Sequence, residues 1–158
     1  MKRLTWLVGP SGAGKSTWAK SLGCRVVEFN DMLAPLVDPF RMRKGVLTAN
    51  ASLVSAVRAV LLHAENAPYG PTLVVVAMVP ETVLFPLSEH EEVWLLLPER
   101  ARWKRQLMTR PVNGGRSGQY DDYEYAGQWY DRLSGWPGRL PVVTIDVPYR
   151  EDLLGGVA

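Results

Sequence analysis

The sequence predicts a three-layer α/β/α fold in which helices cover both faces of a five-stranded parallel sheet. Five apolar runs, at 4–8, 25–29, 72–79, 92–97 and 141–146, alternate with segments of helical periodicity. Strands and helices that alternate along one chain are typical of a doubly wound sheet. A glycine-rich loop joins the first run to a helix, as in folds that bind phosphates. The 158 residues suit a single domain spanning 1–158.

The loop after the first strand matches the pattern GxxxxGK(S/T). Its sequence is Gly9-Pro10-Ser11-Gly12-Ala13-Gly14-Lys15-Ser16. Glycines without a Cβ let the backbone adopt unusual dihedrals and approach a polyphosphate closely. The amides of the loop and of the next helix then point at the anion. The motif is therefore a phosphate loop, and it predicts binding of a nucleoside triphosphate.

Within this motif, Lys15 is expected to reach the β- and γ-phosphates, and the Ser16 hydroxyl is expected to bind Mg²⁺. ATP is the expected nucleotide, with GTP also compatible. The residues predicted to contact the nucleotide are Gly9, Ser11, Gly12, Ala13, Gly14, Lys15, Ser16 and Thr17.

Each predicted helix has a recognisable beginning or end. The first follows the loop over 15–22 and ends at Gly23, since glycine suits a helix C-terminus. Asn50 or Thr48 caps a long helix. That helix has an apolar stripe of Leu53, Val57, Val60, Leu61 and Ala64. Pro80 opens a short helix, and two further helices begin near Pro98 and near Asp121.

Asp31 follows the second strand, at the edge of the sheet where parallel strands place ligand-binding groups. The Asp31 carboxylate is therefore expected where a substrate would be held. The alternative is that Asp31 only caps a helix beginning at Met32, and one residue can have both roles.

The segment 38–45 is rich in turn-forming residues and contains Arg41, Arg43 and Lys44. Two interpretations are equally open. The segment is either a solvated loop or a binding site for an anionic acceptor near Asp31.

A basic helix, the glycine-rich stretch 111–118 and a returning helix predict a lid over bound phosphates, at about 99–120. Arg105 and Arg110 are its candidate catalytic residues, because arginines stabilise the charge that spreads over a transferring phosphoryl group. The alternative is a solvated basic helix beside an ordinary loop.

The third strand ends without an aspartate. Many phosphate-loop NTPases have a magnesium-orienting Asp there, whereas this chain continues Ala77-Met78-Val79-Pro80-Glu81. Glu81 is expected in the first turn of the short helix. This absence argues against switch-type and motor-type NTPases.

The overall composition limits the choice of partners. A net charge of +2 neither requires nor excludes a polyanionic partner. The single Cys24 excludes an internal disulfide framework and suggests a reducing compartment. No run approaches the roughly 18 apolar residues of a membrane span. A cytoplasmic protein without a membrane partner is expected, and the composition does not indicate an oligomeric state.

Taken together, these residues resemble the phosphate-loop kinases, and most closely their polynucleotide-kinase-like branch. The resemblance rests on the phosphate loop with Trp18 after it, on Asn30-Asp31, and on Leu97-Pro98-Glu99 followed by Lys104-Arg105 and Arg110. It implies a nucleotide-kinase-like sheet of order 2-3-1-4-5 and a general-base role for Asp31. Ala34 stands where this branch has a basic residue that holds the acceptor phosphate. The branch includes bacteriophage kinases that phosphorylate hydroxymethylated uracil in DNA.

The sequence therefore predicts an ATP-dependent kinase that transfers the γ-phosphoryl group to an alcohol. A hydroxyl of a nucleotide or nucleic acid is the first expected acceptor, which would make the chain a DNA-modifying enzyme. Arg41 and Arg43 would then contact the acceptor beside Asp31. A small-molecule alcohol, such as a sugar, nucleoside or antibiotic, is the alternative. A further alternative is an NTP-binding switch protein that transfers nothing.

Overall fold

A computed structural model gives the structure of residues 2–29, 32, 50–63, 73–109 and 119–146. Contacts divide the chain into two compact units, one of residues 1–8 and 15–94 and the other of residues 9–14 and 95–158. The phosphate loop 9–14 thus belongs to a different unit from the strand before it and the helix after it. A single kinase domain over 1–158 stays a prediction.

All five predicted strands are present, as β1 (Leu4–Val8), β2 (Arg25–Glu28), β3 (Leu73–Ala77), β4 (Glu91–Leu96) and β5 (Val142–Ile145). Their order is β2-β3-β1-β4-β5, as the family resemblance implied. The strands β2, β3 and β1 pair in parallel; Val8 lies opposite Ala77, and Glu28 lies opposite Val76. An α/β fold around a parallel sheet is thus confirmed for three strands. The direction of β4 and β5 stays a prediction.

The middle strand of the sheet is β1. Every residue of β1 is buried, including the polar Thr5. The central place of β1 sets its carboxyl end, where the phosphate loop begins, between two neighbouring strands.

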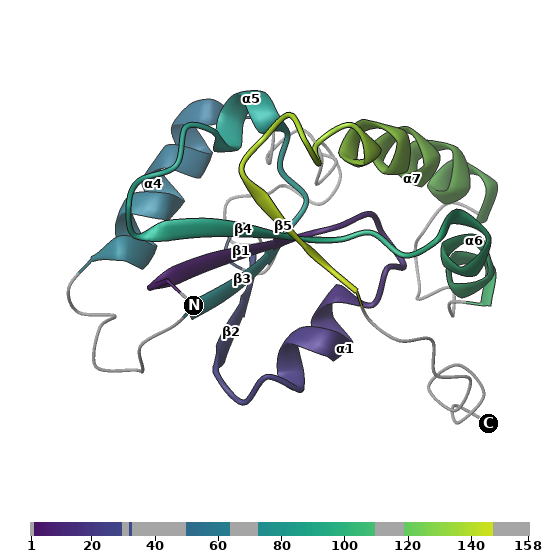
Figure 1. Cartoon of the computed structure of the whole chain (residues 1–158), viewed down its shortest axis with the longest axis horizontal. Coiled ribbons are helices and arrows are strands. Elements are labelled where there is room, and N and C mark those ends of the chain that lie inside the picture. The colour runs from purple at the N-terminus through teal and green to yellow at the C-terminus, as the bar shows by residue number, and fades with distance from the viewer. Residues whose placement is uncertain (1, 30–31, 33–49, 64–72, 110–118, 147–158) are drawn as a thin grey trace. The chain divides into compact units, whose positions relative to one another are not determined.

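The unit that contains β1 has three described helices: α1 (Lys15–Lys20), α4 (Ala51–Leu62) and α5 (Glu81–Leu84). In Figure 1, α4 and α5 lie above the strands of this unit, and α1 lies below them. The predicted cap of α4 is confirmed, because the Asn50 side chain accepts a hydrogen bond from the Leu53 amide. The predicted apolar stripe is only partly right. The helix buries Val54, Val57 and Leu61, whereas Val60 is 59% exposed.

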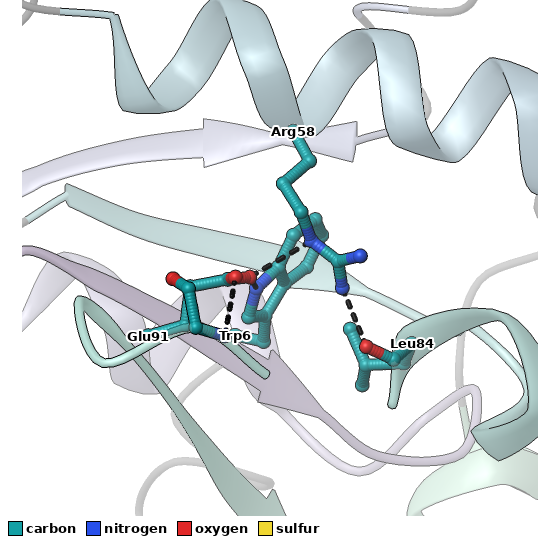
Figure 2. A network of polar contacts seen from close by, with 5 residues as sticks. Trp6, Arg58, Leu84 and Glu91 are labelled. Atoms are coloured by element: carbon teal, nitrogen blue, oxygen red, sulfur yellow. Dashed lines mark hydrogen bonds and ion pairs between the residues drawn. The ribbon is translucent and has the colours of Figure 1, made fainter. Parts of the chain in front are cut away.

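A buried carboxylate joins α4 to the sheet (Figure 2). Glu91, at the start of β4, is 2% exposed. Its Oε2 accepts hydrogen bonds from Trp6 Nε1 at 2.7 Å and from Arg58 Nε at 2.9 Å, and its Oε1 accepts one from the Ser88 amide at 3.1 Å. Arg58 also donates to the Leu84 carbonyl at 2.6 Å. A buried charge is tolerated when it is paired and hydrogen-bonded in this way.

Removal of the Arg58 charge is expected to destabilise the fold. Arg58→Met keeps an apolar stem but leaves the Glu91 carboxylate without a counter-charge, and breaking a buried pair costs about 3 kcal/mol or more. Urea unfolding measures the change in the free energy of unfolding. The matched control is Arg100→Met, because Arg100 pairs with Asp131 at side chains that are 54% and 66% exposed. Exposed pairs contribute at most about 1 kcal/mol. Equal effects of the two variants would contradict a structural role for this network.

The second unit contains α6 (Arg100–Thr109), α7 (Gln119–Ser134) and β5. Both helices bury one face, which contains Trp103, Leu107, Ala126, Trp129, Tyr130 and Leu133. The Trp103 and Tyr130 rings lie 4.6 Å apart. The Tyr130 hydroxyl donates to the Pro98 carbonyl. Of the lid predicted at about 99–120, residues 100–109 and 119–120 are helical, and 110–118 lies outside the described residues.

Within the described parts of the chain, no helix combines the length and the apolar character needed to cross a membrane.

Candidate functional site

The phosphate loop adopts the backbone conformations that its glycines were expected to allow. Gly12 has φ of 78° and Gly14 has φ of 87°. These left-handed values are costly for residues with a side chain. The Ala13 amide donates to the Pro10 carbonyl at 3.2 Å, which closes a tight turn within the loop.

Directly after the loop, α1 begins with Lys15 and Ser16. The Ser16 hydroxyl donates a hydrogen bond to Oε1 of Glu28, the last residue of β2. A hydroxyl that donates a hydrogen bond to a carboxylate keeps its oxygen lone pairs available to a cation. This contact orients Ser16 for the metal-binding role that the motif predicts.

Lys15 lies near the same carboxylate. Burial lowers the pKa of the Lys15 ammonium from 10.5 to about 8, and the negative charge of Glu28 partly opposes this shift. A less hydrated ammonium interacts more strongly with a phosphate than one in open water. At pH 7 the group is still mostly protonated, so it can bind an anion.

The donor set around Ser16 suits Mg²⁺. Among the described residues, no group of three His, Cys, Asp or Glu side chains could hold a metal. Magnesium bound with nucleotides typically takes one or two protein oxygens, with water and phosphate oxygens completing its octahedron. Ser16, with Glu28 behind it, fits this pattern.

In the second unit, the phosphate loop is attached to α6. The Trp103 indole Nε1 donates to the Ser11 carbonyl at 2.8 Å, and the Trp103 side chain is fully buried. Leu107, one turn further along α6, packs against Gly12. A Cβ added to Gly12 would lie 3.0 Å from the Leu107 Cδ1 atom. Gly12 is therefore required both by its positive φ and by the close approach of α6.

The predicted site residues fall into two groups. In the described part, Lys15 and Ser16 are half-buried and Ala13 is buried, whereas Thr17 and Arg105 are exposed on α1 and α6. The structure brings Lys15 and Ser16 together around Glu28. The other candidates, Asp31, Arg41, Arg43 and Arg110, lie outside the described residues, so their roles stay predictions.

Sequence reasoning missed Glu28. The run 25–29 was interpreted only as an apolar strand, and Asp31 drew attention as the nearest acid after it. One available signal was position, because Glu28 is the single acidic residue at the carboxyl end of that strand. Its contact with Ser16 spans 12 residues and depends on how β2 packs beside α1.

A scan of protein-family models matched none to this chain, and a search of curated proteins likewise found no match. Solved structures do match. A shikimate kinase from Bacteroides thetaiotaomicron aligns over 99% of this chain and 97% of its own, with a TM-score of 0.57 at 15% identity. A protein from Thermus thermophilus aligns over 98% and 93%, with a TM-score of 0.56 at 16% identity. A deoxyadenosine kinase from M. mycoides aligns over 98% and 95%, with a TM-score of 0.51 at 12% identity.

The chain has the fold of phosphate-loop kinases. At these identities the likeness concerns the fold alone. It does not identify the polynucleotide-kinase-like branch.

Proposed function

We propose that the chain is an ATP-dependent kinase that transfers the γ-phosphoryl group to a hydroxyl of a small molecule. The main support is the phosphate loop, whose Gly12 and Gly14 have positive φ and whose Ser16 is oriented by Glu28. The likeness in fold to a shikimate kinase and a deoxyadenosine kinase adds to this support.

In this proposal the loop amides and Lys15 bind the β- and γ-phosphates. Ser16 would hold Mg²⁺, which neutralises phosphate charge, and Glu28 would orient the Ser16 hydroxyl. Asp31 would align and deprotonate the acceptor hydroxyl. Arg105 and Arg110 would stabilise the charge that develops on the transferring group.

The structural comparisons favour a small acceptor over the nucleic acid expected first. The names of the two kinases of similar fold refer to shikimate and to the nucleoside deoxyadenosine, which are both small molecules. Neither supports DNA as the acceptor or a role in DNA modification. The net charge of +2 is also low for a chain that binds many phosphates of a duplex.

An acceptor screen tests the proposal. ADP formation from ATP is measured with nucleosides, deoxynucleosides, shikimate and sugars, and with oligonucleotides that contain plain or hydroxymethylated bases. We expect a small alcohol to raise ADP production well above the background of ATP alone. The same assay with GTP establishes the nucleotide preference. ADP production that no acceptor changes would instead support a switch protein without transfer.

The dependence of the acceptor KM on salt separates the two acceptor classes. A small alcohol is expected to give an almost flat response, whereas duplex DNA would give a logarithmic slope of about 0.9 for each phosphate contacted. Arg41→Ala and Arg43→Ala provide the comparison, because they would reduce that slope only if these arginines contact acceptor phosphates. A steep slope that both variants reduce would favour a nucleic acid.

A further inference from the structure

The phosphate loop is held by a side chain outside the motif. Its residues 9–14 group with 95–158, although β1 and α1, which adjoin the loop in the chain, group with the other unit. Two contacts join the loop to α6: Trp103 with the Ser11 carbonyl, and Leu107 with Gly12.

Trp103 is itself held in place from α7. Its ring is fully buried and lies against the Tyr130 ring at an interplanar angle of 34°. The Tyr130 hydroxyl donates to the Pro98 carbonyl, and the Arg100 guanidinium lies 4.6 Å from the centre of the Tyr130 ring. Since the indole has little freedom to move, its N–H presents a fixed donor to the loop.

We propose that Trp103 is a positioning residue that holds the phosphate loop in its nucleotide-binding conformation through the Ser11 carbonyl. The carbonyl of Ser11 must point away from the phosphates if the loop amides are to point toward them, because a peptide bond directs its N–H and C=O oppositely. A donor that holds this carbonyl keeps the following amide in the orientation that binds an anion. The part of this inference that concerns nucleotide binding rests on the proposed kinase function.

The inference also links α6 to nucleotide binding. Helix α6 contains Trp103 and Leu107 on its buried face and Arg105 on its exposed face. A displacement of α6 would therefore act on the phosphate loop directly. Nucleotide binding and the position of α6 become one coupled equilibrium.

The test compares Trp103→Phe with Trp129→Phe in the full chain. Both substitutions remove an indole N–H from a buried ring in the same pair of helices, and the described ring contact of Trp129 is with Arg132. Hydrogen exchange of the loop amides is followed first, without nucleotide. We expect exchange at 9–14 to be about 5-fold faster in Trp103→Phe, the scale of one hydrogen bond, and unchanged in Trp129→Phe.

Calorimetric titration with ADP and steady-state kinetics follow on the same preparations. Trp103→Phe should weaken nucleotide affinity about 5-fold and raise the KM for ATP, with a smaller change in kcat. Should Trp103→Phe fold poorly in urea unfolding, a benzothienyl-alanine at position 103 keeps the ring shape and lacks the N–H. If the loop amides exchange at the wild-type rate in either variant at position 103, the inference is overturned. Absence of nucleotide binding by the wild type would overturn the proposed function, while the exchange experiment would still decide the role of Trp103.

Discussion

Lys15→Ala is expected to lower the rate of phosphoryl transfer by about 100-fold or more, the scale of losing a preorganised electrostatic contact. Lys15 is half-buried beside Glu28, and its ammonium is less hydrated than a free lysine. An ammonium in this setting stabilises phosphate charge more strongly than one in bulk water. Single-turnover measurements at saturating ATP determine the loss.

The exposed Lys20, at the end of α1, provides the matched control. Lys20→Ala removes the same charge from the same helix, five residues further from the loop, and should leave transfer near the wild-type rate. Near-normal turnover of Lys15→Ala would contradict the assignment of the phosphate loop.

The lowered pKa of Lys15 also predicts a pH dependence of nucleotide binding. Only the ammonium form attracts phosphates, and a bound phosphate raises the pKa of this group. Below pH of about 8 the free protein already has the charge, so affinity for ADP is constant with respect to this group. Above pH 8 binding must take up a proton, and affinity should fall by up to about ten-fold per pH unit. Titrations with magnesium chelated, between pH 7.5 and 9.5, measure the slope, which Lys15→Ala should lack.

Asp31→Asn is expected to lower transfer by roughly 10²–10⁴-fold, the usual loss of a general base. The reason is chemical. An attacking hydroxyl must be aligned with the γ-phosphate, and a carboxylate that accepts its hydrogen bond both aligns it and takes its proton. Asparagine is nearly isosteric and can still cap a helix, so the fold should survive. Nucleotide affinity should change little, since Asp31 is not expected to touch the phosphates.

Glu28→Gln is the informative comparison for Asp31→Asn, because both remove a carboxylate at or just after the end of β2. Glu28 contacts Ser16, so its loss should raise the magnesium concentration needed for half-maximal activity. Excess magnesium should restore the activity of Glu28→Gln but not that of Asp31→Asn. If Asp31→Asn keeps full transfer, Asp31 is only a helix cap and the base lies elsewhere. If it loses ATP binding, Asp31 belongs to the metal site.

Much of this protein follows from local sequence. The phosphate loop could be predicted because its function needs particular residue types at fixed spacing. Such a pattern can be recognised in the sequence without knowledge of the fold. The first strand was predictable because a continuous apolar run bounded by turns is typical of a strand buried on both faces, and every residue of β1 is buried. The Asn50 cap was predictable because the amide that it satisfies lies only three residues further along the chain.

The tertiary structure decided the contacts between residues far apart in the chain. Glu28 meets Ser16, Trp103 meets Ser11 over 92 residues, and Glu91 meets Trp6 over 85. Strand order and helix packing set these pairings, so the sequence alone does not show which of these side chains meet. The exposure of Val60 was mispredicted for the same reason. Periodicity identifies an apolar face of α4, but only the neighbouring elements determine how much of that face is covered.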